Sequence, residues 1–515
     1  MSAQALPSRS ARERLRGIET ILASGPISIG LVFIGGLALG VALWYAAVTH
    51  TARLGIGIDS SLAISLVVGV LVAFVGWVAY GHYFARRAGI DVPTALRWDA
   101  PTWAALVLSG VGLLVPVAYG GPTRFAAFAI GVFALAKLLV AARFVNTVRA
   151  VLMTFVVTRV SIIVIAELAS VTIAQRPGLH VSESTNPLLA AWGHWDSVHY
   201  LDIARRGYAG TDMAFFPLYP ALIRFIGNLI GNDLIAGLII SNVALFFGLL
   251  FFYKLVEHQY TRNVAQRAVF YISIFPTAVF FSAVYTESLF FALTVASFYY
   301  IREHRWVTAG IVGTFAALTR SEGVILVVPF AIEVFSAIRA GSFAQFASSP
   351  KRLAKVVVGI VAIPLGLGAY MSWLWVLNGD PLYFSHVQTH WNRHFAAPWV
   401  SATTAFEKVA TAKSPLVAAN QTIEIFFTIL MIGVLVAGLR RMRPSYSAYM
   451  ALSILIPMST SSLMSMPRFA LVLFPMFSLL AVWGGRSWVN NTIVAFSLPL
   501  LGLFTVLFAD WYWVA

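Results

Sequence analysis

Cysteine is absent from this chain of 515 residues. Its absence excludes thiol nucleophiles, thiolate metal sites, iron–sulfur clusters and a secreted fold held together by disulfides. Charged residues are also scarce, at 11%, whereas a soluble domain carries about 25%. Length alone would indicate roughly three soluble domains. So few charges cannot cover the surface of a soluble globule of this size, and that reading is excluded.

Apolar residues take the place of the missing charges. They make up 59% of the chain, and the mean hydropathy is +0.83. Apolar runs recur along the sequence, and several are long enough to cross a bilayer, which takes about 20 residues. They begin near Ile27, Ser61, Thr102, Phe125, Arg149, Leu234, Gln266, Ser288, Trp306, Val324, Ala354, Thr422, Ser445, Phe469 and Val489. The sequence predicts an all-α polytopic integral membrane protein with roughly 12–15 transmembrane helices, some of them broken or re-entrant.

Acidic residues are outnumbered by basic ones, 20 against 35, which gives a net charge of +15. In a soluble protein this excess would indicate nucleic acid. In a membrane protein it indicates orientation instead, because Lys and Arg gather in cytoplasmic loops. With a cytoplasmic N-terminus, roughly twice as many basic residues fall on the inner side as on the outer side. We therefore predict a multi-pass protein of the cell membrane, surrounded by lipid, with no nucleic-acid partner.

This orientation places two long loops on the extracytoplasmic side, at about residues 175–233 and 378–420. They hold most of the ten histidines and are rich in Trp and Tyr. No other loop is comparable, so we expect the chemistry to lie there. The first loop also contains the apolar, proline-broken stretch 215–220, which is too short to span. It is typical of an amphipathic or re-entrant segment at the membrane interface.

The first outer loop concentrates acid, imidazole, indole and guanidinium groups within residues 192–208. Asp196 and His199 are three residues apart, so a helix would place them on one face. An interfacial helix with aromatic belt residues is the alternative, but the density of reactive groups favours a site. Flat rings for a sugar and guanidinium groups for a phosphate come from Trp195, Tyr208, Arg205 and Arg206.

Several segments carry a family resemblance. They are WDSVHYLDIARRGY at 195–208, AFFPLYP at 214–220, FPTAVFFSAVYTESLF at 275–290, LTRSEG at 318–323, GDPL at 379–382 and PRF at 467–469. Together they resemble the PIG-V-type mannosyltransferases, which add the second mannose to glycosylphosphatidylinositol precursors and have prokaryotic relatives. The resemblance covers about residues 149–515. Residues 1–148, with the first four spans, lack it and are expected to form a separate N-terminal module.

The resemblance implies a GT-C-like helical bundle that uses a lipid-phosphate-linked sugar and inverts the anomeric centre. An acidic residue of the first large outer loop is then the base, which is Asp196, and His199 binds substrate or phosphate. The implied donor is a polyprenyl-phosphate hexose, with mannose the expected sugar, and the acceptor is a glycolipid or glycan. Further substrate-binding candidates are Phe216, Tyr285, Glu287, Arg320, His386, Arg393 and Arg468.

The chemistry suits these residue types without the family. A hydroxyl is a poor nucleophile until a positioned base takes its proton. A carboxylate beside an indole is partly desolvated, which raises its basicity. A lipid monophosphate that leaves develops negative charge, and cations must stabilise that charge. Asp196 and the arginines of the outer side therefore form a coherent set.

Three alternatives concern the same residues. His386, His390 and His394 are spaced as one helix face that would suit a metal, but no carboxylate joins them at ligand spacing, so we expect no metal and no cofactor. A polytopic transporter or lipid flippase would show inverted repeats and polar groups near the midplane, and neither is evident. A catalytically inactive scaffold is disfavoured because Asp196 and His199 are both present.

Overall fold

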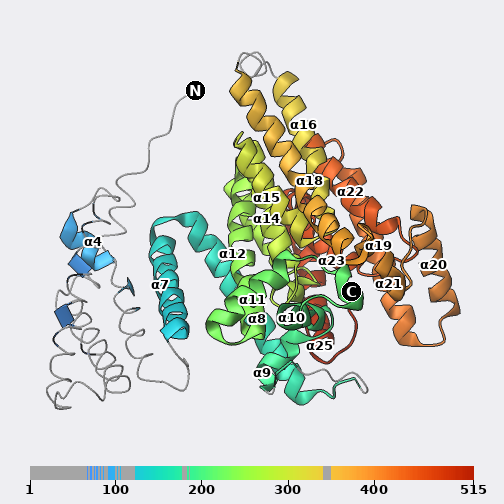
Figure 1. Cartoon of the computed structure of the whole chain (residues 1–515), viewed down its shortest axis with the longest axis horizontal. Helices are drawn as coiled ribbons and strands as arrows, with labels where there is room; N and C mark the ends of the chain where they lie inside the picture. Colours follow the sequence, from blue (N-terminus) through green and yellow to red (C-terminus); the bar gives the residue numbers. More distant parts are fainter. Residues whose placement is uncertain are drawn as a thin grey trace. The chain divides into compact units, whose positions relative to one another are not determined.

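The computed structural model describes residues 122–176, 183–184, 186–339 and 349–514, together with 92–98 and scattered positions from 37 to 105. It divides into two compact units, residues 1–149 with 229–231, and residues 150–228 with 232–515 (Figure 1). The first unit contains α4 (Val92–Trp98) and the apolar helix α7 (Pro122–Phe144). The spans expected from Ile27, Ser61 and Thr102 lie almost wholly outside the described residues.

The second unit is built from helices. Its α-helices are α8 (Asn146–Thr172, which begins just before the unit boundary), α9 (Pro187–Ala190), α10 (Asp196–Arg206), α11 (Leu218–Ile230), α12 (Asp233–Gln259), α13 (Arg262–Ser273), α14 (Glu287–Arg302), α15 (Trp306–Thr319), α16 (Val327–Ala337), α18 (Pro350–Asn378), α19 (Tyr383–His386), α20 (Pro398–Thr411), α21 (Pro415–Gly438), α22 (Pro444–Met458), α23 (Met466–Val472), α24 (Phe474–Trp483) and α25 (Ser487–Ala509). Short 3-10 helices are η1 (Ala191–Gly193), η2 (Gly210–Ala214), η3 (Ala278–Phe281), η4 (Ser321–Leu326) and η6 (Val387–Trp391).

Five of the described helices are long and apolar enough to cross a membrane: α8, α12, α18, α21 and α25. A sixth span is broken, because α23 and α24 meet at a bend of 72°. Within the part of the chain that is described, the only strand-like pairing is an isolated bridge between Phe395 and Thr460. The predicted class, an all-α polytopic membrane protein, is therefore confirmed. The total number of crossings stays a prediction.

Small residues bring helices α15 and α18 into close contact. A Cβ placed on Gly310 would lie 2.2 Å from the carbonyl oxygen of Gly359, and one on Gly366 would lie 2.3 Å from that of Thr314. No side chain fits at either position. Apolar side chains gain little from leaving lipid, so membrane helices associate through such close backbone packing. Helix α15 ends at Thr319, directly before Arg320.

The run expected to cross from Gln266 is not one helix. Helix α13 ends at Ser273, and the chain then continues irregularly through η3 as far as Glu287. Non-helical backbone at membrane depth needs hydrogen-bond partners from the protein. Arg159 of α8 supplies them, because its guanidinium donates to the carbonyls of Ser273 (2.8 Å) and Ala278 (2.9 Å). The irregular segment thereby delivers residues 285–287 to the site.

Arg159 and Glu167 are eight residues apart, which places them on nearly the same face of α8 and predicts a structural role for both charges. Glu167 accepts a hydrogen bond from the Trp192 indole at 3.1 Å. Arg159 and Glu167 therefore each join α8 to a different neighbouring segment.

Candidate active site

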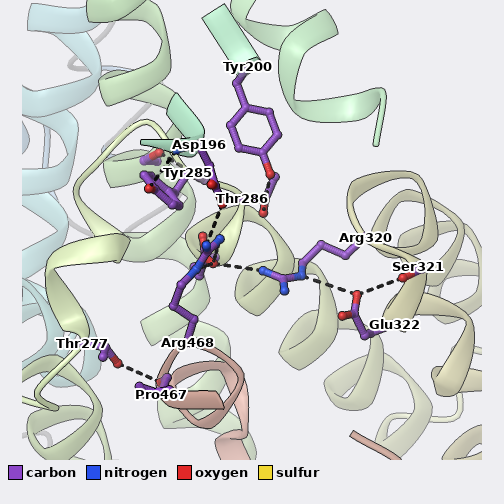
Figure 2. Close-up of polar contacts among 12 residues, drawn as sticks. Asp196, Tyr200, Thr277, Tyr285, Thr286, Arg320, Ser321, Glu322, Pro467 and Arg468 are labelled. Atoms are coloured by element: carbon purple, nitrogen blue, oxygen red, sulfur yellow. Dashed lines mark hydrogen bonds and ion pairs between the residues drawn. The ribbon is translucent and has the colours of Figure 1, made fainter. Parts of the chain in front are cut away.

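The centre of the candidate site is the guanidinium of Arg468 on α23. Its Nη1 donates to Asp196 Oδ2 at 2.6 Å (Figure 2). Its Nε donates to Glu287 Oε1 at 2.8 Å. The Glu287 side chain is 0% exposed, whereas that of Asp196 is 25% exposed. Arg468 therefore joins a fully buried carboxylate to a partly accessible one. A carboxylate at the end of an apolar run, as Glu287 is, could also simply reach the lipid headgroups, but a side chain with no exposed surface does not do so.

A second arginine extends this cluster. Arg320 Nη1 donates to the same Glu287 Oε1 at 3.0 Å, and its Nε lies 3.5 Å from Glu322 Oε2. The Arg468 guanidinium also lies 4.8 Å from the ring centre of Tyr285. The two guanidinium groups thus meet three carboxylates, Asp196, Glu287 and Glu322. The planar fork of an arginine also matches phosphate oxygens, so an anion that binds here has to displace one of these carboxylates.

Asp196 is the first residue of α10, and its surroundings fix its position. Its backbone N–H donates to Tyr285 Oη at 3.2 Å, and Tyr285 Oη donates to the carbonyl of His194 at 3.4 Å. The preceding residue, Trp195, has φ = +58°. Backbone strain of this kind persists only where the surrounding packing imposes it. The Trp195 ring packs against Trp511, at 5.6 Å between centroids.

The short helix that carries Arg468 is capped by Glu424, a residue that the sequence did not single out. Glu424 of α21, 3% exposed, accepts the backbone N–H groups of Ser465 (3.0 Å) and Met466 (2.8 Å). Ser465 has φ = +73°, and α23 begins directly after it. The carboxylate thus caps the short helix that carries Arg468. An acidic residue inside an apolar run is a signal that would have found it.

His199 lies one turn after Asp196 on α10, as predicted, and has its own acidic partner. Its Nδ1 lies 2.8 Å from Asp212 Oδ1, and its ring stacks on Phe215 at 4.6 Å. Trp391 meets the same imidazole edge-on at 6.2 Å. The pairing through Nδ1 leaves Nε2 available to a ligand. Asp212 was not selected from the sequence, because no motif joins it to His199.

The two arginine candidates of the first loop, Arg205 and Arg206, lie away from the Arg468 cluster. Arg205 pairs with Glu183 and Asp233, and the side chain of Arg206 is 81% exposed. Neither contacts the Arg468 cluster. Two aromatic candidates of the first loop, Tyr208 and Phe216, both pack against Tyr370 of α18.

The second loop differs from the expected single helix face. Helix α19 ends at His386, and η6 ends at Trp391, where Asn392 adopts a left-handed conformation. His394 therefore lies beyond the helical segment, and the predicted face of three histidines is wrong. The His386 ring lies 2.7 Å from Asp380, and this hydrogen bond lowers the pKa of Asp380 below its usual range. Arg393 donates to the carbonyl of Met464 at 3.3 Å.

Comparison with known proteins identifies the enzyme class. Residues 133–363 match the family model described as mannosyltransferase (PIG-V). The matched stretch, just under half of the chain, is similar to this glycosyltransferase family. The match starts before the expected Arg149 and includes Asp196, His199, Glu287 and Arg320, whereas Arg468 lies beyond it. No curated protein matches.

Two solved structures are similar to the chain. One is ArnT from Cupriavidus metallidurans bound to undecaprenyl phosphate, at 12% identity over 69% of this chain and 76% of that chain, with a TM-score of 0.40. The other is the Archaeoglobus fulgidus oligosaccharyltransferase in complex with zinc and sulfate. It is 16% identical over 68% of this chain and 52% of that chain, with a TM-score of 0.31.

Proposed function

We propose that this membrane glycosyltransferase moves a hexose, mannose being the expected sugar, from a polyprenyl-phosphate carrier to a glycolipid or glycan acceptor. The reaction takes place on the extracytoplasmic face and inverts the anomeric centre. One observation carries the proposal: the guanidinium of Arg468 joins the accessible carboxylate of Asp196 to the buried carboxylate of Glu287. A base and a phosphate-binding cation therefore lie within a single hydrogen bond of each other.

The proposed reaction is a single displacement. The acceptor hydroxyl oxygen attacks the anomeric carbon from the side opposite the phosphate, and its proton passes to Asp196. The bond between the anomeric carbon and the phosphate oxygen breaks, and its electron pair leaves with the polyprenyl phosphate. Arg468 and Arg320 stabilise the negative charge that develops there. No metal is needed for charge balance in this step, and we propose no cofactor.

The ion pair between Arg468 and Asp196 has a consequence for the order of binding. Asp196 accepts a 2.6 Å hydrogen bond from Arg468 Nη1, the same donor that a phosphate would use. The donor phosphate competes for Arg468 Nη1, while Nε remains on the buried Glu287. Asp196 is released from the guanidinium as the phosphate binds, and its oxygen is then open to the proton of the acceptor hydroxyl. Donor binding therefore precedes efficient proton transfer.

His199 is assigned to substrate binding in the same proposal. Its Nδ1 is engaged by Asp212, which leaves Nε2 to contact a hydroxyl or a phosphate oxygen near Asp196. The stacking partner Phe215 fixes the plane of the ring. The pair resembles the acid-supported imidazoles that many sites use to fix a tautomer.

A transfer assay tests the proposal. Purified full-length protein in lipid nanodiscs receives polyprenyl-phosphate mannose, glucose or galactose with an extracted membrane glycolipid fraction, and mass spectrometry identifies the lipid products. We expect sugar transfer from at least one lipid-phosphate donor. Transfer from a nucleotide sugar instead would overturn the donor assignment. Movement of intact lipid across the bilayer with no glycosidic product would favour the flippase alternative.

A further inference from the structure

A cavity of about 480 Å³ lies between the two loop segments, outside the arginine cluster. Its volume lies within the usual range of small-molecule sites, about 300–1,000 Å³. Segment η2 supplies one side and α19 with η6 supplies the other. The lining residues are Gly210, Thr211, Tyr383, His386, Val387, Thr389 and His390.

The lining mixes polar and apolar side chains, and none of them is Lys, Arg, Asp or Glu. Hydroxyl groups come from Thr211, Tyr383 and Thr389, and imidazoles come from His386 and His390. The Nδ1 atom of His386 is taken by Asp380 outside the lining, so its Nε2 is the free ring nitrogen. Such a set donates to and accepts from hydroxyls, whereas a phosphate would favour arginine.

The cavity borders the surroundings of His199 on two sides. Thr211 directly precedes Asp212, whose Oδ1 lies within hydrogen-bond distance of His199 Nδ1, at 2.8 Å. His390 directly precedes Trp391, whose ring meets that of His199 at 6.2 Å. His199 and Asp196 share a face of α10, one turn apart. A ligand in the cavity that extends past His199 therefore approaches the carboxylate of Asp196.

We infer that this cavity binds the headgroup of the acceptor, that this headgroup is an uncharged, hydroxyl-rich sugar or polyol, and that the cavity directs one of its hydroxyls past His199 toward Asp196. The inference rests on the proposed function. It separates the two substrates by chemistry: the lipid phosphate of the donor binds the arginines, and the neutral acceptor binds hydroxyls and imidazoles. Tyr383 adds a flat ring for contact with the carbohydrate face.

The experiment uses alkyl glycosides as acceptor probes. Full-length protein in nanodiscs receives the active polyprenyl-phosphate sugar with octyl mannoside, octyl glucoside, or a mannoside phosphorylated on its ring. Octanol serves as the hydroxyl-poor control. We expect transfer to a neutral glycoside, with a lower acceptor KM than for the phosphorylated probe or for octanol.

Variants then assign the probe to the cavity. Thr211→Val and His390→Ala each remove one polar group, and each should raise the acceptor KM by about 3- to 10-fold. The donor KM should not change. Matched controls are Thr403→Val and His394→Ala, exposed residues outside the lining, which should leave both KM values as they are.

The outcomes separate this inference from the proposed function. Donor use with the membrane glycolipid fraction but no transfer to either neutral glycoside would overturn the acceptor class. So would a preference for the phosphorylated probe. Cavity variants that leave the acceptor KM unchanged, or that raise the donor KM instead, would overturn the location. Absence of donor use by the wild-type protein with any acceptor would contradict the proposed function itself.

Discussion

Arg468 and Asp196 are 272 residues apart in the sequence and form an ion pair with 2.6 Å between Nη1 and Oδ2. The pair is asymmetric, because the side chain of Arg468 is 7% exposed and that of Asp196 is 25% exposed. Glu287 holds the buried side of the guanidinium. The pair therefore places a buried, anchored cation next to a carboxylate that a substrate can reach.

Replacement of Asp196 by Asn tests the base. Asn keeps the shape of the side chain and its carbonyl still accepts from Arg468, but it does not take a proton. We expect turnover to fall by roughly a hundredfold or more, with an unchanged melting temperature in detergent. Asp202→Asn on the same helix is the matched control and should keep its turnover. Near-normal turnover of Asp196→Asn would remove this residue from the mechanism.

Replacement of Arg468 tests the phosphate contact. Lys keeps the charge but loses the fork, so it can no longer serve Glu287 and a phosphate together. We expect Ala to lower turnover by more than about 30-fold at saturating donor, with Lys intermediate. A loss confined to the donor KM would mean that the contact does not strengthen in the transition state. Arg262→Ala, at an exposed position, controls for removal of an arginine.

Glu424 is predicted to act through Arg468. Its carboxylate accepts two backbone N–H groups at the start of α23, and Gln offers only one acceptor atom to them. We expect Glu424→Gln to lose about 1–3 kcal/mol of stability and to lower turnover more than it changes the donor KM. Glu407→Gln, at an exposed position on α20, should do neither. A variant with lower stability but full turnover would restrict Glu424 to a structural role.

The sequence predicted which residues belong to the candidate site better than it predicted the contacts between them. Asp196 and His199 were found because they share a short helix, where spacing alone places them on one face. Glu287, Arg320 and Arg468 were each selected as members of separate motifs. That one carboxylate oxygen of Glu287 receives both arginines depends on how three distant segments pack, and no local pattern contains that information.

The residues that the sequence reasoning missed are partners. Asp212 and Glu424 are acidic residues that belong to no motif in the sequence. Each has a role only because folding brings it to its partner, His199 for Asp212 and the start of α23 for Glu424. The break after Ser273 was missed for a related reason. Its apolar residues read as a continuous span, whereas the hydrogen bonds from Arg159 make an irregular backbone tolerable at that depth.

The orientation of the membrane domain is predicted from its basic loops and can be tested with single cysteines, since the native chain has none. Ser385 and Lys351 are exposed and flank opposite ends of α18. In intact cells, Ser385→Cys should react with an impermeant maleimide, and Lys351→Cys should react only after the cells are permeabilised. The reverse pattern would place the site on the cytoplasmic face, where nucleotide sugars are the available donors.

The last prediction concerns acid sensitivity. His194 is 2% exposed, stacks on Trp511 at 4.1 Å, and lies 3.3 Å through Nδ1 from the carbonyl of Phe508. Burial lowers its pKa to about 4, from 6.5. Between those values the unfolded chain binds a proton that the folded protein does not, so stability falls as the pH drops from 6.5 towards 4. The full effect of His194 is on the order of 3 kcal/mol.

Thermal unfolding in detergent at pH 7, 6 and 5 measures this effect as a slope. His194→Gln loses some packing and should unfold at a lower temperature at pH 7, but its melting temperature should fall less between pH 7 and pH 5 than that of the wild type. His394→Gln, at an exposed position, is the matched control and should keep the wild-type slope. Equal slopes for all three proteins would mean that His194 binds a proton equally well in the folded and unfolded states. The contacts of His194 with Phe508 and Trp511 would then not be a source of acid sensitivity.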